Sequence, residues 1–343
     1  MTYQLHAGEA TLRDLRGGAA AMGLGIGNVY YVIKQTEAYY PLFVEEYSVD
    51  YRDGTNSICA DKGVTTTDQA VAVLNTGIQD ALNKCVANRN DYVVVMPSQT
   101  DYDIGATITL SKKCVHLICP AAFGNSVGCT NAARIDQLYA GSVFKVSDSA
   151  IEIAGFYIKN YLNKPALELC TSAYAPNIHN NDFIMRLSST TGEPIIQGNV
   201  TGDTLHDGGG WGVIEYNWFV DGVGDASTVV PIIVNITTQA TAARVSHNEL
   251  TIGDGMTATV GIGNYAVKGR VDYNTFGTGG GDKDSTNGGT FTHCIATTAG
   301  TGASCIGNRA TVQDDALITG GTTNKTCSDN MNSAGGGVVD DGA

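Results

Sequence analysis

Ile214-Glu-Tyr-Asn217-Trp-Phe219 is one of five loose copies of a pattern in the second half of this 343-residue chain. Each copy has an apolar residue, two variable residues, Asn, one variable residue and a second apolar residue. The other copies are Ile178-His-Asn-Asn181-Asp-Phe183, Val245-Ser-His-Asn248-Glu-Leu250, Val271-Asp-Tyr-Asn274-Thr-Phe276 and the fainter Cys305-Ile-Gly-Asn308-Arg-Ala310. The Asn positions 181, 217, 248, 274 and 308 are 36, 31, 26 and 34 residues apart. A repeat of this length predicts a solenoid or a propeller, in which each unit packs only against its neighbours.

The flanks of each copy are rich in β-branched and aromatic residues, which predicts a strand, a sharp bend and a second strand. Asn suits the bend because it tolerates a left-handed backbone and its amide bonds to local backbone groups. Stacked Asn side chains can also form a ladder of hydrogen bonds between coils. We therefore predict an all-β parallel β-helix, with an antiparallel sandwich as the alternative.

The rest of the chain fits one elongated solenoid with additions at each end. A strand is expected at 92–97, two further short strands within 108–120, and an earlier coil at 151–158 with Gly155 at or next to its bend. Apolar residues three and four positions apart in 67–87 predict an amphipathic helix that covers the open first coil. The predicted segments are a flexible arm, a Tyr-rich base, a capping helix, the β-helix and a Gly-rich tail or cap: 1–27, 28–66, 67–90, 91–315 and 316–343.

Gly77-Ile-Gln-Asp-Ala-Leu-Asn83, followed by Asp91-Tyr-Val-Val-Val-Met-Pro97 and Tyr102, resembles the start of right-handed parallel β-helix proteins. That family has a capping helix with an Ile-Gln-x-Ala motif, then a strand that ends in Pro. It includes pectate lyases, polygalacturonases and bacteriophage tailspikes. The resemblance covers about residues 67–315 and implies the right-handed coil; it implies nothing about a reaction.

Composition narrows the function classes. A net charge of −14 argues against nucleic acid as a partner, because phosphate binding needs a basic face. No secretory signal is visible, and the Gly/Ala-rich stretch Gly17 to Gly27 is too short to cross a membrane. The sequence has no Cys-x2-Cys pair and no cluster of His with Cys, so neither a zinc site nor any other cofactor is expected.

Nine cysteines are many for a cytosolic product, and the number is odd. One interpretation is that several are small buried residues inside the coils, as Cys114 and Cys119 would be. The other is that thiols oxidise after release from a reducing cytoplasm, with one left to link chains. The candidate disulfide residues are Cys59, Cys129, Cys170, Cys294, Cys305 and Cys327.

The search for a catalytic site finds little. Glycosidases need two carboxylates at a defined separation. The polygalacturonase motifs are missing, and Asp314-Asp315 follows the recognisable repeats. The remaining candidates are His206, Asp207, Glu215, Asp221 and Asp225. They lie near Trp211 and Trp218 in the sequence, which suggests a sugar-binding wall. The alternative is an ordinary surface loop. We therefore predict no catalytic residues and no metal ligands, although a polysaccharide-degrading activity is not excluded.

A Tyr-rich segment precedes the expected helix. Tyrosine is common at protein interfaces, and the alternative is packing at the base of the solenoid. The candidate capsid or trimer contacts are Tyr30, Tyr31, Tyr39, Tyr40, Phe43, Tyr47 and Tyr51. This segment, followed by helix and coils, resembles virion proteins of tailed bacteriophages, which are expected as trimers that decorate or link the capsid, or as spikes.

These observations predict a non-enzymatic virion protein, made in the host cytoplasm and placed on the outer surface of the head. Its expected partners are two further copies of itself, in a homotrimer, and the major capsid protein or other virion proteins. The alternative is a tail spike or fibre that binds, or also cleaves, a host surface polysaccharide. A bacterial surface adhesin fits less well, because it would need a secretion signal.

Overall fold

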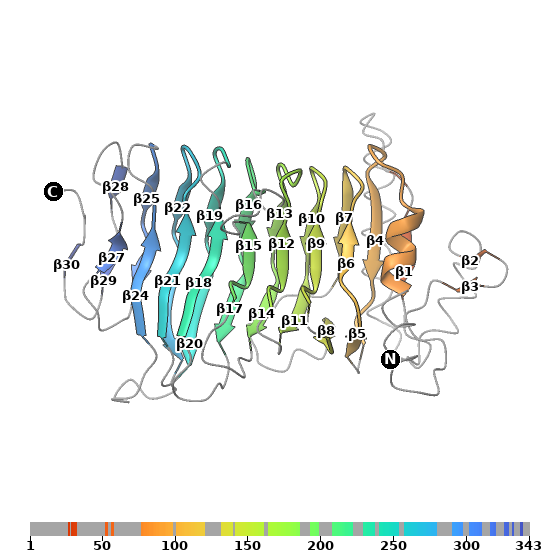
Figure 1. Ribbon diagram of the computed structural model, residues 1–343, viewed down its shortest axis with the longest axis horizontal. Coiled ribbons are helices and arrows are strands. Elements are labelled where there is room, and N and C mark those ends of the chain that lie inside the picture. The colour runs from red at the N-terminus through yellow and green to blue at the C-terminus, as the bar shows by residue number, and fades with distance from the viewer. Residues whose placement is uncertain are drawn as a thin grey trace.

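The structure is a computed structural model of the 343-residue chain. It describes 27, 29–32, 52–53, 56–57, 77–98, 101–120, 132–139, 141–160, 164–185, 193–198, 208–221, 229–236, 240–253, 257–279, 290–297, 302–310, 316–319, 326–328, 331–332 and 337–338. The predicted parallel β-helix is confirmed, because the chain winds repeatedly through three long sheets (Figure 1). Through the body of the stack each coil contributes one strand to each sheet, and these strands pair in parallel with their equivalents in the next coil.

The first sheet holds ten strands: β1 (Val29–Val32), β4 (Asp91–Val95), β7 (Val115–Ile118), β10 (Glu152–Ala154), β13 (Asn177–His179), β16 (Val213–Glu215), β19 (Arg244–Ser246), β22 (Arg270–Asp272), β25 (Ser304–Ile306) and β28 (Thr326–Ser328). The second sheet also holds ten: β5 (Tyr102–Ile104), β8 (Ala133–Gln137), β11 (Phe156–Asn160), β14 (Asp182–Met185), β17 (Trp218–Asp221), β20 (Glu249–Gly253), β23 (Thr275–Gly279), β26 (Arg309–Ala310), β29 (Met331–Asn332) and β30 (Gly337–Val338).

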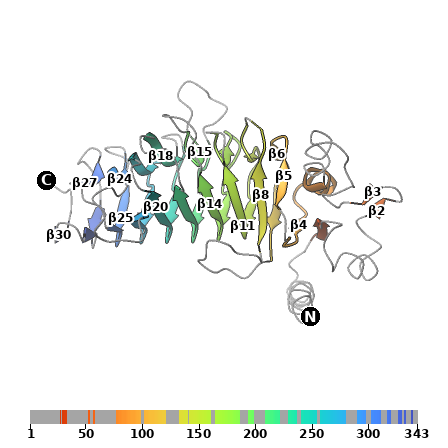
Figure 2. The ribbon, with the colours of Figure 1, turned by 90° about the horizontal axis from the view of Figure 1, so that it is seen from below.

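The third sheet holds β6 (Ile108–Leu110), β9 (Phe144–Val146), β12 (Leu167–Leu169), β15 (Ile196–Gly198), β18 (Val229–Ile236), β21 (Thr257–Asn264), β24 (Thr290–Ala296) and β27 (Ala316–Thr319). A separate antiparallel pair joins β2 (Arg52–Asp53) to β3 (Asn56–Ser57). Figure 2 shows β2 and β3 at one end of the stack and β30 at the other.

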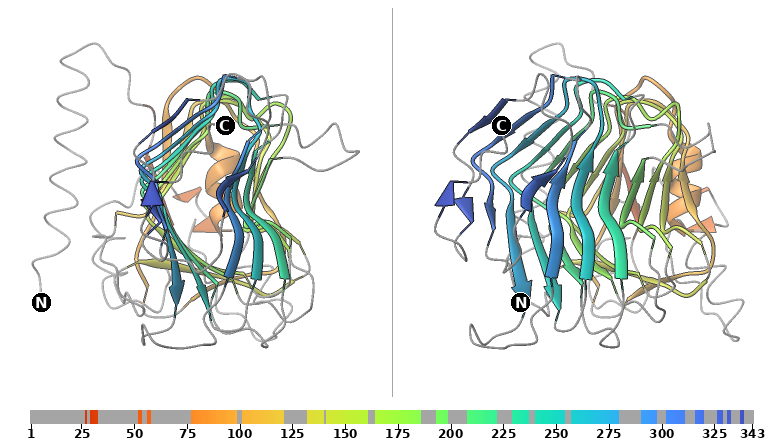
Figure 3. Two further views of the ribbon diagram at one scale, coloured as in Figure 1. Left: turned by 90° about the vertical axis from the view of Figure 1, so that its left-hand side faces the viewer. Right: turned by 60° about the vertical axis from the view of Figure 1, so that its left-hand side comes forward.

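The core fills the inside of the coils. Side chains alternate in and out along each strand, so each short strand turns one or two apolar residues inward, one in β13 and two in β6. Ile178, Ile214 and Val245 follow one another in register in the first sheet, and all are buried. In the second sheet Phe183 and Phe219 stack with ring centroids 5.0 Å apart. Burying each such side chain stabilises the fold by about 1.5–3 kcal/mol, and the view along the stack shows the coils superposed around this interior (Figure 3).

The repeated Asn residues form a ladder at the bend between the first and second sheets. Each donates from Nδ2 to the Oδ1 of the Asn in the next coil, at 3.0–3.1 Å, from Asn181 through Asn217, Asn248 and Asn274 to Asn308. Their backbone N–H groups donate to the same Oδ1 atoms at 2.9–3.0 Å. All five side chains are buried. Irregular repeat spacing is compatible with the ladder, because the extra residues enter elsewhere in each coil.

The left-handed residue of this bend is not the ladder Asn, and our expectation on that point is wrong. The residue before it has the positive φ: Asn180, Tyr216, His247, Tyr273 and Gly307, with φ from 54° to 65°. This turn aims the next side chain into the coil, where Asn meets both its neighbours. Gly155 holds the same place in the preceding coil, with a φ of 86°, as its expected position at a bend required.

A helix over residues 77–84 lies at the β1 end of the stack, and its apolar side, with Ile78, Ala81 and Leu82, belongs to the core (Figure 1). Gln79 explains why a glutamine stands in this helix. Its Oε1 accepts the backbone N–H of Thr109 at 2.8 Å, and its Nε2 donates to the Thr109 carbonyl at 3.2 Å. Thr109 belongs to β6, the terminal strand of the third sheet. Gln79 thus supplies the two bonds that a neighbouring strand would make.

We expect Gln79→Ala to lower the free energy of unfolding by about 2 kcal/mol, because two backbone groups lose their partners. Urea unfolding followed by circular dichroism measures the change. Asn83→Ala is the matched control, since it removes the exposed hydrogen bond that the Asn83 side chain accepts from Gln79 and leaves the Thr109 bonds in place. Equal effects of the two substitutions would contradict a role of Gln79 at the strand edge.

The stack continues past residue 315. Ile318 of β27 pairs with Ile295, and Cys327 of β28 with Cys305, while β29 and β30 form an antiparallel hairpin at the edge of the second sheet. Apolar residues therefore keep the coil register into the segment expected as a tail or cap. At the other end, β1 belongs to the first sheet through its pairing with β4, although its residues fall in the expected base segment.

Candidate functional site

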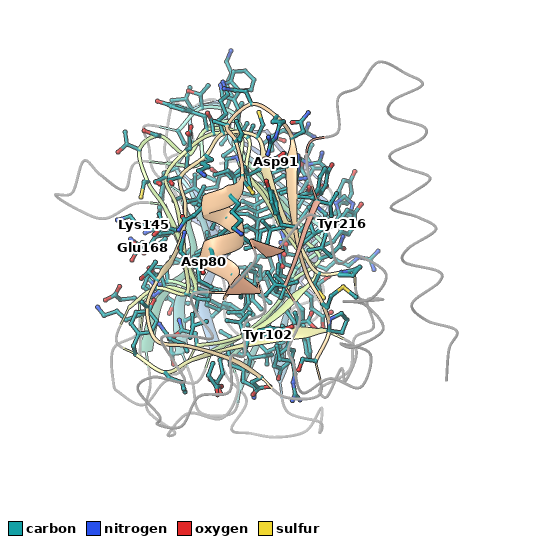
Figure 4. The ribbon with its side chains drawn as sticks, turned by 90° about the vertical axis from the view of Figure 1, so that its right-hand side faces the viewer. Asp80, Asp91, Tyr102, Lys145, Glu168 and Tyr216 are labelled. Carbon is teal, nitrogen blue, oxygen red and sulfur yellow. The ribbon has the colours of Figure 1, made fainter. Side chains whose placement is uncertain are left out.

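The outer face of the first sheet is bordered on both sides by residues in the left-handed conformation. One column precedes the strands and includes Ala175, Trp211, Ala242 and Lys268; the other follows them and includes Tyr216, His247 and Tyr273. Their φ values lie between 50° and 56°. Each costs on the order of 1–2 kcal/mol for a residue with a Cβ. Figure 4 shows Tyr216 at the outside of the coil, opposite Lys145 and Glu168 of the third sheet.

Large aromatic rings occupy several of these strained positions and remain exposed. Trp211 is 64% exposed, Tyr216 54% and Tyr273 54%, and Tyr174, next to the first column, is 55% exposed. Gly or Asn would fit such turns with less strain, as Gly155 and Asn180 do. Exposed large side chains that are kept on a strained backbone indicate a functional face.

The second column forms a stack of rings along the solenoid. The His247 ring lies 5.0 Å from that of Tyr216 and 5.2 Å from that of Tyr273, with interplanar angles of 25° and 29°. Gly307 lies under Tyr273, and a Cβ there would come within 2.5 Å of the ring. The absence of a side chain at Gly307 therefore leaves room for the Tyr273 ring, which is the last ring of this stack among the described residues.

Charged side chains lie between the two columns. Arg244 and Arg270 are register partners on β19 and β22. Arg244 donates from Nε to the Ser246 hydroxyl at 2.9 Å and lies 3.4 Å from Glu215. Arg270 lies 2.9 Å from the carboxylate of Asp272, which is buried. We call this surface the ring face. It comprises Glu215, Arg244 and Arg270 on the strands, and Tyr174, Trp211, Tyr216, His247, Lys268 and Tyr273 along their two borders.

A second polar cluster lies on the same sheet, nearer its β1 end. Glu152 of β10 bonds to His116 Nδ1 on β7 at 2.6 Å and to His179 Nε2 on β13 at 2.7 Å. Tyr92 stacks on His116 at 4.2 Å. Burial alone would raise the pKa of Glu152, but the bonds from the two imidazoles outweigh it and lower this pKa to about 2. Glu152 thus holds three coils together as a carboxylate.

Trp211 and Trp218 do not form one wall. Trp211 precedes β16, whereas Trp218 follows the ladder bend in β17 of the second sheet, so the two lie on different faces. Trp218 is half-buried and its Nε1 lies 3.4 Å from the Thr251 hydroxyl. Glu215 does lie on the face with Trp211. His206, Asp207, Asp225 and Asp314-Asp315 are outside the described residues, and Asp221 is described in its backbone alone.

Sequence reasoning missed most of the ring face. The sequence did contain one signal for this face: the variable position before the ladder Asn holds an aromatic ring at Tyr216, His247 and Tyr273. The pairing of Arg244 with Glu215, and of Glu152 with two histidines, has no such signal, because each set comes from different coils.

Tyr30 is the one candidate capsid or trimer contact whose side chain the structure describes. It is buried, its hydroxyl donates to the Lys84 carbonyl at 3.0 Å, and Arg89 Nη2 donates to that hydroxyl at 3.1 Å. It therefore packs at the base of the solenoid, which was the alternative interpretation. Tyr31 is described in its backbone alone, and the remaining candidates lie outside the described residues: Tyr39, Tyr40, Phe43, Tyr47 and Tyr51.

The disulfide prediction is wrong for the candidates whose side chains are described. Cys170, Cys294 and Cys305 are buried in the coils and form no disulfide. They fill space as small apolar residues, and burial raises the pKa of Cys294 to about 12. Cys59 and Cys129 lie outside the described residues, and Cys327 is described in its backbone alone.

Within the part of the chain that the structure describes, no three or more His, Cys, Asp or Glu side chains are grouped to hold a metal ion. The described residues also include no helix of the length and apolarity needed to cross a membrane.

Comparison with known proteins gives little further guidance. No family model matches the chain, and no curated protein does. Among solved structures, the chain is similar to ORF18 of Geobacillus virus E2, with 11% sequence identity and a TM-score of 0.35. The match covers 89% of this chain and 74% of that one. A likeness with this TM-score establishes neither fold nor function, so the fold stands on the sheet topology described above.

Proposed function

We propose that the chain is a non-enzymatic structural protein of a tailed-phage virion, a head decoration or linking protein that acts as a homotrimer. The placement of β1 carries the proposal. Because β1 extends the first sheet beyond β4, residues 1–27 join the solenoid at that end. An arm attached there would bind the shell and leave the coils projecting outward. A stack held by a continuous Asn ladder is a rigid unit suited to that position.

Gold-labelled antibodies on intact particles test the location, with label over the head as the expected result. Deleting residues 1–27 should then abolish binding to shells while leaving the circular dichroism spectrum of the coils unchanged. Label confined to the tail tip, or full shell binding by the truncated chain, would contradict the proposal.

A second candidate is a spike that binds host surface polysaccharide. The ring face favours it, because exposed aromatic rings beside carboxylate and guanidinium groups are the side chains that bind sugars by stacking and hydrogen bonding. Label at the tail tip would bring this candidate into first place.

A further inference from the structure

We infer that the ring face binds an acidic saccharide chain, one that carries carboxylate groups. This inference rests on the second candidate function and names its ligand class. It begins from the exposed rings of Trp211, Tyr216 and Tyr273, which the fold holds at the surface in strained turns.

The charge of the face selects the class of ligand. The chain carries a net charge of −14, yet the outermost charges here are cations. The Arg270 side chain is 55% exposed and that of Arg244 38%, whereas Glu215 is 25% exposed and Asp272 only 2%. Lys268 is exposed in the adjoining turn. Guanidinium groups bind carboxylates through paired hydrogen bonds, so a carboxylated ligand complements this face.

The size of the face favours a narrow ligand over a second copy of the chain. Four strands, β13 to β22, span about 15 Å at about 4.8 Å per strand, and residues 211–216 span about 17 Å. That is on the order of 250 Å², well below the roughly 800 Å² per partner of a stable protein interface. A saccharide running across the coils needs only a strip of this width.

The fluorescence of Trp211 can report on ligand binding, because the chain has only two tryptophans. In a Trp218→Phe background, iodide quenching of fluorescence reports on Trp211 alone. We expect an alginate hexamer, which carries a carboxylate on each sugar, to protect Trp211 from quenching in a salt-sensitive manner. Maltohexaose, a neutral chain of equal length, should protect it at least tenfold less well.

Arg244→Gln should lower the affinity for the alginate hexamer at least tenfold. Circular dichroism and thermal unfolding verify that this variant is folded. Lys145→Gln is the matched control, because Lys145 lies on the opposite side of the coil and its loss should change nothing (Figure 4). Tyr273→Ser, which leaves the Arg pairs intact, should also weaken binding.

The inference would be overturned by no protection from alginate, by equal protection from maltohexaose, or by an Arg244→Gln variant that binds alginate as tightly as the parent. Protection by an acidic peptide of six glutamates as strong as that by alginate would overturn it too, since the rings would then give no preference for sugar. Equal protection by both sugars would leave the spike function standing, and antibody labelling of particles decides that function independently.

Discussion

Asn248→Ala should lower the free energy of unfolding by about 4 kcal/mol, the largest effect of a single substitution that we expect. Asn248 lies inside the ladder, so its loss removes partners from groups in both neighbouring coils. Its Oδ1 accepts from the backbone N–H and the Nδ2 of Asn217, and its Nδ2 donates to the Ile214 carbonyl and to Asn274 Oδ1. A buried group left without a partner costs about 1–3 kcal/mol.

Chemical unfolding of the purified chain measures this loss. Asn177→Ala is the matched control, because Asn177 faces outward from β13, and it should change the free energy of unfolding by less than about 0.5 kcal/mol. Asn248→Asp should be worse than Asn248→Ala, since it places a charge where three oxygen atoms need a donor. Similar stability of Asn177→Ala and Asn248→Ala would show that the ladder is not an important source of stability.

The five repeats predicted the fold because each copy carries the same physical demand. An apolar residue on either side of a bend must face the interior, and an amide in the bend must meet its equivalent in the next coil. Those demands recur at 178–183 and at each later copy, so the sequence alone indicates the coil. They do not indicate which residue takes the left-handed turn, because Asn suits both the turn and the ladder; the packing of Asn181 inside the coil leaves the turn to Asn180.

The functional face was harder to predict because it depends on register across insertions. His116, Glu152 and His179 are 36 and 27 residues apart, and they meet only because each lies on a first-sheet strand of successive coils. Arg244 and Glu215 meet in the same way. Tyr30 was ambiguous for a related reason: tyrosine suits both an interface and a solenoid base, and only the contact with Lys84 shows that it packs at the base.

The cluster around Glu152 leads to a dependence of stability on pH. In the unfolded chain Glu152 titrates at its ordinary pKa of 4.5, whereas in the folded chain the two histidines hold its pKa at about 2. A carboxyl group whose pKa is lowered by folding stabilises the fold where it is ionised in both states, which is above pH 4.5. That stabilisation declines as the pH falls from 4.5 and is lost below about 2.

Glu152→Gln should therefore lower the free energy of unfolding by about 2 kcal/mol at pH 6, because the neutral amide cannot accept hydrogen bonds from both imidazoles. The difference from the parent chain should shrink through the interval between pH 4.5 and 2. Urea unfolding at a series of pH values measures it, with Glu249→Gln, an exposed carboxylate on β20, as the control that shows no such interval. A constant difference across the series would mean that Glu152 acts through packing alone, and that the charge linking β7, β10 and β13 contributes nothing.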